Sequence, residues 1–234
     1  MGHNVADIRN FAVCGHGSSG KTSLVDSLLV KSGAVNGQPS VDAGTSICDF
    51  DEEEKHHKHS VESTVTHFDH AGKHFHAIDT PGYPDLVGQM IGALRAVETA
   101  LITVDAHTGI KVNTRRAWAE AEKAGCGRIL VITKLDTDNI DFEGLLASIK
   151  EVFGPTCTLL NVPLGLGSDL KGVASTLQVP DDTGGAVVDP AEISEALVES
   201  IIEVDEAAME RYFEGEMPTP EQLSTLMVRA IADG

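Results

Sequence analysis

The sequence predicts an α/β fold with a mostly parallel sheet and helices on both faces. Along the 234-residue chain, short apolar runs alternate with helical patterns, and this alternation is typical of parallel crossover units. The first apolar run, Arg9–Cys14, leads into a glycine-rich loop followed by a helical pattern. Because 41% of the residues are apolar, the chain can bury one large core, or one core and a satellite subdomain.

The expected elements follow one another with few ambiguities. A helix begins after the glycine-rich loop and ends near Ser32, while residues 35–60 lack apolar periodicity and are expected to form a long loop. A hairpin is expected around Ala71-Gly72. The later strands are predicted at Ser63–His67, His74–Ile78, Ala100–Val104, Arg128–Thr133 and Thr158–Val162, and the later helices at about Pro84–Val97, Asn113–Ala124 and Phe142–Phe153.

The last quarter of the chain differs from the rest. After a loop at Gln178–Pro190, an acidic amphipathic helix is expected over Ile193–Val204. A second helix is expected to start at Pro220, with Thr219 as its cap. We therefore expect an α/β domain over residues 1–177 and an acidic, mainly helical insertion subdomain over residues 178–234.

The charge of the chain limits its possible partners. The net charge is −19, and the segment from Asp181 to Gly234 holds fourteen Asp and Glu against two Arg. Such a surface disfavours direct wrapping of nucleic acid, which requires Lys and Arg. It suits a basic protein partner, or a solvated helix face that keeps the protein soluble.

Cysteine usage and hydropathy indicate the compartment. The four cysteines show no C-x-x-C spacing, which is typical of small apolar side chains in a reducing environment. No signal segment and no apolar run long enough to span a bilayer are present. We expect a cytoplasmic monomer without membrane association.

The glycine-rich loop matches G-x-x-x-x-G-K-[ST] in full. Glycines let backbone N–H groups converge on phosphates at a helix N-terminus, whose dipole favours the anion. Lys21 is then expected to contact the outer phosphates, and the Thr22 hydroxyl to bind Mg2+. A turn that binds nothing is the less favoured alternative, because a strand and a helix flank the loop. The expected phosphate-binding residues are Gly15, His16, Gly17, Ser18, Ser19, Gly20, Lys21 and Thr22.

A second motif, Asp79-Thr80-Pro81-Gly82, follows a predicted strand. Asp79 is expected to hold Mg2+ through water, and the Gly82 N–H to bond the terminal phosphate. Because that bond is lost after hydrolysis, Gly82 would act as the sensor of a two-state switch. Ser60 is the first candidate for a further hydroxyl ligand of Mg2+, and Thr64 is the second.

A third motif, Thr133-Lys134-Leu135-Asp136, follows the strand Arg128–Thr133. Asp136 can accept two hydrogen bonds from the edge of guanine, whereas adenine would leave the carboxylate unpaired. The motif therefore favours GTP over ATP, and it argues against the alternative of an ATP-using P-loop enzyme. Its usual first residue is Asn, and Thr133 keeps a hydroxyl but lacks the amide, which predicts lower affinity with unchanged base choice.

Together these motifs resemble the translational GTPase family, and within it the elongation factor G subfamily. Three further segments carry the resemblance: Asp49–Lys55 before the switch hydroxyl, Pro163–Val173, and Glu203–Glu216, which is similar to the helical insertion of that subfamily. The resemblance implies a P-loop NTPase domain of the Ras-like GTPase type that binds GTP or GDP with Mg2+. It also implies GTP hydrolysis on the ribosome, in translocation or a related step, with the acidic insertion meeting the ribosomal stalk protein. The Ser-Ala guanine loop and later domains of the family are expected beyond Gly234.

The departures from the family pattern suggest a divergent paralogue. Tyr83 stands where translocases carry His, and a phenol can position water but is not a base at pH 7. With Tyr83, Lys21 and Gly82 as the expected catalytic residues, we predict a GTPase that is slow in isolation. Ser18 replaces a frequent Asp, and the segment before Ser60 differs from the family's Arg-Gly-Ile-Thr. Two functions stay open: a ribosome-stimulated GTPase, or a GTP-binding regulatory switch with little hydrolysis.

The ten histidines raise the possibility of a metal site. They concentrate in two places, with His56, His57 and His59 before Ser60, and His67, His70, His74 and His76 around the hairpin. Alternation places His74 and His76 on one strand face, which is suitable for Zn2+. No thiolate or fixed carboxylate joins them in a recognised spacing, so a solvated, histidine-rich surface is the preferred interpretation.

Overall fold

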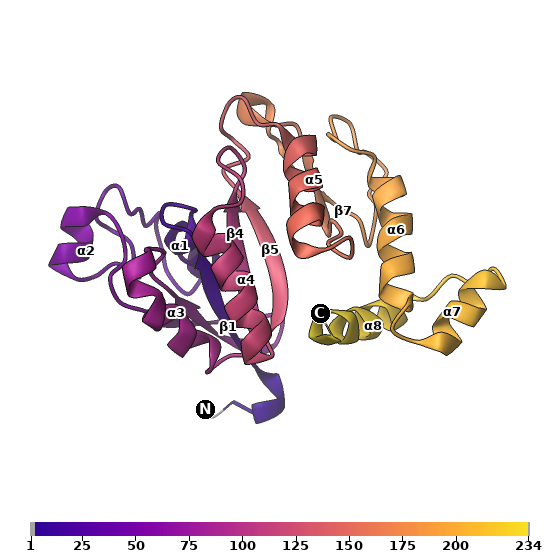
Figure 1. Cartoon of the computed structure of the whole chain (residues 1–234), viewed down its shortest axis with the longest axis horizontal. Helices are drawn as coiled ribbons and strands as arrows, with labels where there is room; N and C mark the ends of the chain where they lie inside the picture. Colours follow the sequence, from indigo (N-terminus) through magenta and orange to yellow (C-terminus); the bar gives the residue numbers. More distant parts are fainter. Residues whose placement is uncertain (1–2, 234) are drawn as a thin grey trace. The chain divides into compact units, whose positions relative to one another are not determined.

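The computed structural model describes residues 3–233 of the chain. They form two compact units, one ending at Thr133 and the other starting at Lys134 (Figure 1). The domain boundary expected after residue 177 falls inside the second unit and stays a prediction. Within the described residues, no helix has both the length and the apolar character needed to cross a membrane.

The first unit is built around a five-stranded sheet with the order β2-β3-β1-β4-β5. Neighbouring strands are parallel, except that β2 runs antiparallel to β3 at one edge. The predicted mostly parallel sheet is therefore confirmed. The strands are β1 (Ile8–Gly15), β2 (Thr64–His70), β3 (Lys73–Asp79), β4 (Thr99–Asp105) and β5 (Gly127–Thr133).

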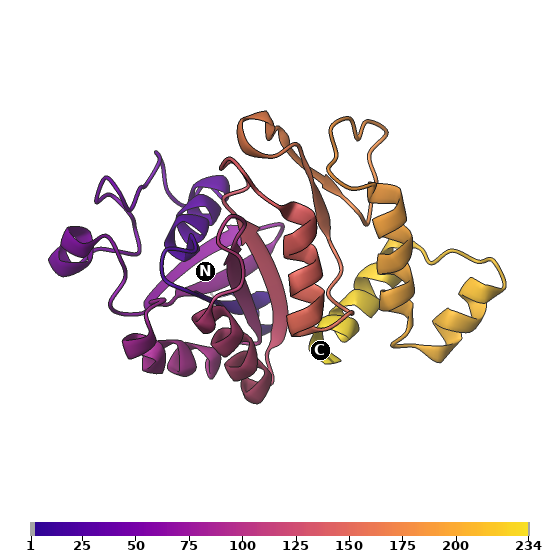
Figure 2. The ribbon, with the colours of Figure 1, turned by 45° about the horizontal axis from the view of Figure 1, so that its top comes forward.

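Helices cover both faces of this sheet, as predicted. Alternate residues of β1 point to opposite faces: Val13 packs with Val25 of α1, whereas Ala12 packs with Leu94 of α3 and Ala117 of α4. Figure 2 shows α1 on one side of the sheet and α3 and α4 on the other. The helices of this unit are α1 (Lys21–Lys31), α2 (Glu52–His57), α3 (Val87–Leu94) and α4 (Val112–Ala124), with 3-10 turns at Val5–Asp7 and Pro84–Leu86.

Two expectations for this unit need correction. Residues 35–60, expected as a loop, contain α2, which is stabilised by a capping box: Asp51 accepts from the Glu53 N–H at 2.9 Å, and Glu54 accepts from the Asp51 N–H at 3.3 Å. The helix expected from Pro84 begins as a 3-10 turn, and its α-helical part ends at Leu94.

The second unit contains one helix, a two-stranded hairpin and a group of three further helices in its described part. The strand expected at Thr158–Val162 lies instead at Asn161–Leu164 and pairs antiparallel with a strand that was not predicted. Leu159 and Leu160 accept hydrogen bonds from Thr176 rather than extending the strand. The elements are α5 (Phe142–Phe153), β6 (Asn161–Leu164), a 3-10 turn at Gly167–Asp169, β7 (Gly172–Ser175), α6 (Pro190–Ile202), α7 (Glu206–Phe213) and α8 (Pro220–Asp233).

Helices α6, α7 and α8 share a small hydrophobic core of their own. Its buried residues are Leu197, Val198, Ile201, Ile202, Ala208, Leu223 and Leu226. The predicted start of α8 is confirmed, since the Thr219 hydroxyl accepts from the Gln222 N–H at 3.3 Å. The helical character expected for the last quarter is thus present, with a break between α6 and α7.

The cysteines pack as the sequence suggested, and the single tryptophan packs within the first unit. Cys14, Cys48 and Cys126 are buried thiols, and Cys157 is half-buried. Burial raises the pKa of the Cys14 thiol to about 12, so it behaves as a small apolar side chain. Trp118 packs against the core on the α4 face, with the Arg128 guanidinium 4.5 Å from its ring centroid.

Candidate functional site

The loop between β1 and α1 depends on two glycines. At Gly15, φ is 142° and an added Cβ would lie 2.9 Å from the Thr103 carbonyl oxygen, so a larger residue does not fit. Gly20, with φ of 83°, precedes the first residue of α1. The loop thus leads the chain into a helix N-terminus, where unpaired N–H groups and the helix dipole attract an anion.

Buried polar side chains fix the shape of this loop. The Ser19 hydroxyl donates to the His16 carbonyl at 2.7 Å and lies 2.6 Å from the Thr103 hydroxyl. Lys21 is buried, and its Nζ donates to the same His16 carbonyl at 2.8 Å. Burial lowers the pKa of Lys21, and the neighbouring Asp79 partly offsets this effect. The single cation of the loop is therefore held in place before any anion arrives.

Four oxygen-bearing side chains meet beside the start of α1. The Thr22 hydroxyl donates to Oδ2 of Asp79 at 2.6 Å and lies 3.1 Å from the Ser60 hydroxyl. Ser60 in turn donates to Oδ1 of Asp49 at 2.6 Å. The structure thus brings together all three predicted metal ligands, Thr22, Ser60 and Asp79, and it adds Asp49 to them.

This oxygen cluster fits a hard divalent cation such as Mg2+. Among the described residues, Oδ1 of Asp79 and Oδ2 of Asp49 are buried and have no hydrogen-bond partner. Burial raises the pKa of Asp79 to about 7 and also raises the pKa of Asp49. Oxygen-only ligands of this kind suit Mg2+, and the charge of the ion would compensate the buried carboxylates.

Two further residues near this cluster make contacts that define their roles. The second hydroxyl candidate, Thr64, donates to the Cys48 carbonyl at 2.9 Å and so is engaged elsewhere. Asp26 of α1, which the motifs did not indicate, accepts from the Ile47 N–H at 3.1 Å and anchors the segment that carries Asp49. Asp26 belongs to no recognised motif, and Asp49 begins a segment that carries the family resemblance but had no assigned role. Only the three-dimensional contacts show what these two carboxylates do.

Gly82 lies against the phosphate loop. A Cβ at this position would collide with Nζ of Lys21 and would lie 2.6 Å from the Gly17 nitrogen. The Gly82 carbonyl accepts from Nδ2 of Asn113 at 2.7 Å, which fixes the peptide from the α4 side. The predicted sensor residue and the predicted phosphate-binding lysine are therefore neighbours.

Tyr83 lies next to Gly82 and half faces solvent, with 41% of its surface exposed. Its ring atoms come within 3.4 Å of the position that a Cβ on Gly17 would take, and its centroid is 4.5 Å from that of His59. The phenol thus stands at the edge of the phosphate loop, where an attacking water could be positioned.

The third motif begins at the end of β5. The Thr133 hydroxyl donates to the Ser19 carbonyl at 2.9 Å and lies 3.2 Å from the Val104 carbonyl. The hydroxyl that Thr133 keeps therefore supports the phosphate loop from β5. In the second unit, Lys134 and Asp136 are exposed on a turn closed by Thr137, whose hydroxyl donates to the Lys134 carbonyl at 2.8 Å.

Comparisons with known proteins agree with these features. Residues 6–228 match the family model of the elongation factor Tu GTP binding domain. Two curated relatives are named elongation factor G-like protein and come from Mycobacterium tuberculosis strains CDC 1551 / Oshkosh and ATCC 25618 / H37Rv. Each is 34% identical to this chain over 240 residues, and the alignment covers 97% of this chain and 33% of the relative. A solved structure of a Thermus thermophilus protein is 34% identical with a TM-score of 0.86, covering 98% of this chain and 36% of that one.

The chain spans about a third of the length of the relatives that it matches. The family match covers nearly all of the described residues, and the predicted resemblance to translational GTPases is confirmed. This chain belongs to the family of the elongation factor Tu GTP-binding domain, within the translational GTPases.

Proposed function

We propose that this chain binds GTP and GDP with Mg2+ and hydrolyses GTP slowly, as the nucleotide domain of an elongation factor G-like translation factor. The observation that carries the proposal is the group formed by Thr22, Ser60 and Asp79 beside Lys21. It joins buried carboxylate and hydroxyl oxygens to a buried ammonium at a helix N-terminus. Such an arrangement suits a phosphate chain that carries a divalent cation.

Each residue of the first unit has a defined task in this proposal. Lys21 and the N–H groups of the loop hold the phosphates, while the Gly82 N–H contacts the terminal phosphate and releases it after hydrolysis. Thr22 and Ser60 would hold Mg2+ through their hydroxyls, and Asp79 through water. When bound, the ion neutralises charge on the phosphates.

Base selection is assigned to the third motif. Asp136 accepts hydrogen bonds from the guanine edge, and adenine would leave its carboxylate unpaired. Lys134 supports the base site from the same turn, and Thr133 links β5 to the phosphate loop through the Ser19 carbonyl. The absence of an amide at Thr133 predicts weaker binding than in relatives that carry Asn.

A second candidate function rests on Tyr83. A phenol at the edge of the phosphate loop can orient water but is not a base at neutral pH. If that step limits the rate, the protein serves as a GTP-binding regulatory switch with little hydrolysis. The contact between Tyr83 and His59 supports this alternative, because it holds the phenol against the segment that carries Ser60.

The proposed setting is the ribosome in the cytoplasm. The support comes from the elongation factor G-like relatives and from the acidic helices α6, α7 and α8, which suit a protein partner rather than RNA. We propose the ribosomal stalk protein as that partner. We propose that residues 178–234 form the insertion subdomain that makes this contact, and that the factor acts as a monomer.

Nucleotide binding and hydrolysis by the full-length protein that carries this domain test the proposal. Fluorescent GDP should bind in the presence of Mg2+, and GTP but not ATP should displace it. Single-turnover hydrolysis is then measured with and without ribosomes, for the wild type and for Tyr83→His, with Tyr83→Phe as the matched control that lacks both the hydroxyl and the imidazole.

The outcomes separate the two functions. Ribosome-stimulated hydrolysis supports the GTPase, whereas tight GTP binding without stimulation supports the regulatory switch. A faster Tyr83→His variant identifies the phenol as the limitation, and an unchanged rate rejects that explanation. Displacement of the fluorescent nucleotide by ATP as readily as by GTP would contradict the role of Asp136.

A further inference from the structure

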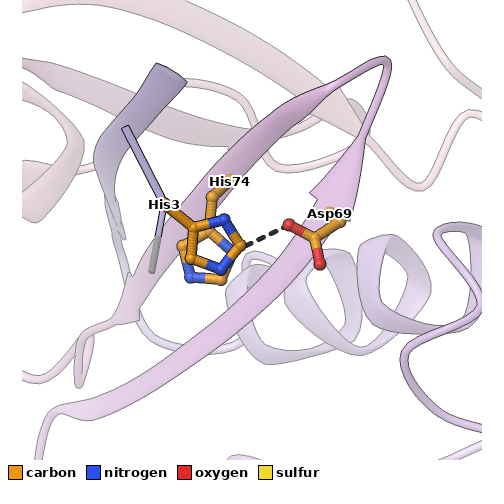
Figure 3. Close-up of side chains that lie close together, drawn as sticks. All are labelled: His3, Asp69 and His74. Atoms are coloured by element: carbon orange, nitrogen blue, oxygen red, sulfur yellow. Dashed lines mark hydrogen bonds and ion pairs between the residues drawn. The ribbon is translucent and has the colours of Figure 1, made fainter. Parts of the chain in front are cut away.

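One face of the β2–β3 hairpin gathers imidazoles around a carboxylate. In the antiparallel register, Asp69 lies directly opposite His74, and His67 lies opposite His76. Residues two apart on a strand share a face, so all four side chains project from the same side of the hairpin. The segment before β1 adds His3, whose ring stacks on His74 with a centroid separation of 3.8 Å (Figure 3).

The donor atoms of this group are close enough for one metal ion. Nδ1 of His74 lies 2.8 Å from Oδ1 of Asp69. One donor atom from each of His3, Asp69 and His74 falls within 4.8 Å of the other two. Two donors bound to the same tetrahedral Zn2+ lie about 3.3 Å apart, so the Asp69–His74 pair already has nearly this spacing. His3, which stacks on His74, must turn its ring out of the stack to present a nitrogen to the same ion.

Asp69 supplies the carboxylate that the sequence pattern did not identify. The pairing of β2 with β3 holds its carboxylate against His74, while the carboxylate itself stays open to solvent. His74 is buried, whereas Asp69 and His3 are exposed. One ligand is therefore fixed by the fold, and the other two are open to an ion arriving from solvent.

We propose that His3, Asp69 and His74 form a binding site for Zn2+ or a similar borderline transition metal. The ion takes the place of the proton shared by Asp69 and His74, with Nδ1 and Oδ1 as ligands, and one ring nitrogen of His3 completes the set. The site is separate from the Mg2+ group, because His74 lies near the start of β3 and Asp79 at its end. The two sites also differ in preference, since imidazole nitrogen favours Zn2+ over Mg2+.

Two flanking histidines increase the density of nitrogen donors. The ring centroid of His74 is 4.8 Å from that of His76 and 5.4 Å from that of His67. Two imidazoles on one tetrahedral ion have centroids about 5 Å apart, so a fourth donor lies within reach of a side-chain rotation. Nδ1 of His76 lies 3.1 Å from the Asn10 amide oxygen, which leaves Nε2 as the ligating nitrogen of His76.

A second group, formed by Glu53, His56 and His57, is a weaker candidate. Its donor atoms are similarly close, but all three side chains are exposed on the six-residue helix α2. No strand pairing fixes them, so ordering them around an ion carries a larger entropy loss. This second group therefore provides a matched control.

Metal binding would have a structural consequence. His3 belongs to the segment before β1, whereas Asp69 and His74 belong to the hairpin that contains the edge strand β2. An ion shared by them ties the N-terminal segment to that edge. Bound Zn2+ should therefore raise the free energy of unfolding of the first unit, and above the dissociation constant this gain should grow with the logarithm of the free Zn2+ concentration.

The test is a Zn2+ titration by calorimetry on the full-length protein with a histidine-free C-terminal tag. Excess Mg2+ and GDP occupy the nucleotide site throughout. Co2+ absorption gives an independent readout, since tetrahedral coordination has a characteristic visible spectrum. The variants are His3→Gln and Asp69→Asn, both at exposed positions. His70→Gln, which removes an exposed imidazole from the opposite face of β2, and the double variant His56→Gln/His57→Gln are the controls.

We expect one Zn2+ per chain in the wild type and in both controls. His3→Gln and Asp69→Asn should each bind Zn2+ at least tenfold more weakly and lose the Co2+ absorption. Wild-type affinity in both of these variants would overturn the proposal, as would loss of binding in the α2 double variant. Absence of Zn2+ uptake by the wild type would also overturn it.

Discussion

Replacing Asp79 by Asn should stabilise the nucleotide-free protein while removing a Mg2+ ligand. Asp79 is 1% exposed, and burial raises its pKa from the ordinary value of 3.8 to about 7. Because this acid is harder to ionise in the folded state than in the unfolded state, it destabilises the fold at high pH. The interval between the two pKa values corresponds to about 4 kcal/mol, at 1.36 kcal/mol per pH unit.

The sign of the effect defines the pH window. Below pH 3.8 Asp79 is protonated in both states and contributes nothing. Between pH 3.8 and about 7 the unfolded state loses its proton while the folded state retains it, so unfolding becomes more favourable as the pH rises. The stability gained by Asp79→Asn should therefore grow by about 2–3 kcal/mol between pH 5 and pH 8 and stay constant at higher pH.

Urea denaturation followed by tryptophan fluorescence measures this difference. Trp118 is the only tryptophan of the chain and lies in α4, in the same unit as Asp79. Asp26 and Asp49, whose pKa values burial also raises, are present in both proteins. The difference between the two curves therefore reports Asp79 together with its repulsion from these two carboxylates. The exposed Asp85→Asn variant is the control.

Addition of Mg2+ and GDP should narrow the difference in stability between the two proteins. A ligand at a hundred times its dissociation constant adds about 2.7 kcal/mol to the protein that binds it, and the wild type should gain more than Asp79→Asn. Parallel pH profiles for the wild type and Asp79→Asn, without a difference that grows from pH 5 to pH 8, would refute the reasoning. Equal stabilisation of both by Mg2+ and GDP would refute the assignment of Asp79 as a metal ligand.

Three further predictions follow from single contacts. Thr133→Val removes the hydrogen bond to the Ser19 carbonyl, so fluorescent GDP should bind roughly fivefold more weakly, equivalent to about 1 kcal/mol; unchanged affinity would show that the bond does not support the loop. Gly82→Ala forces a Cβ against Lys21, so single-turnover GTP hydrolysis should slow by about tenfold or more, equivalent to at least 1.4 kcal/mol. A wild-type rate would contradict the close contact between Gly82 and Lys21. Leu197→Ala should destabilise the core shared by α6, α7 and α8 by about 2–5 kcal/mol. Hydrogen exchange of the backbone amides of these helices measures this loss, with the exposed Val228→Ala variant as the control. Equal exchange in the two variants would argue against a shared core.

The sequence predicted most elements of the first unit because their signals are local. Each strand of the parallel sheet is a short apolar run, and the loop at Gly15–Thr22 has a fixed spacing that only a phosphate loop requires. Helix α2 was not predicted, because its sequence lacks the local apolar signal of the other elements. It has no apolar face, and its stability comes from the capping box and from Glu54, whose Oε1 also accepts from the Val61 N–H at 2.9 Å. Periodicity does not detect a helix that is held by polar contacts.

The remaining site residues depend on long-range contacts. Asp49 meets Ser60 eleven positions later, and Asp26 meets Ile47 across twenty-one positions; no spacing rule predicts either pair. The shift of β6 to Asn161–Leu164 has a similar origin, because pairing with β7 decides which residues of an apolar run form the ladder. Local pattern identified the motif residues, and only tertiary packing identified their partners.

Three of the buried carboxylates of the first unit, Asp26, Asp49 and Asp79, explain why the cation site should control the loop that carries Ser60. Asp26 and Asp49 hold that loop through hydrogen bonds to its backbone or hydroxyl groups, and both raise the pKa of Asp79 by charge repulsion. Without a cation, ionisation of these groups works against the packing that joins the loop to α1 and β3. A divalent ion offsets this repulsion, because its positive charge attracts all three carboxylates, and the packing of the loop is then favoured. The loop should therefore be most ordered with Mg2+ and nucleotide bound, which is the coupling that a nucleotide-dependent switch requires.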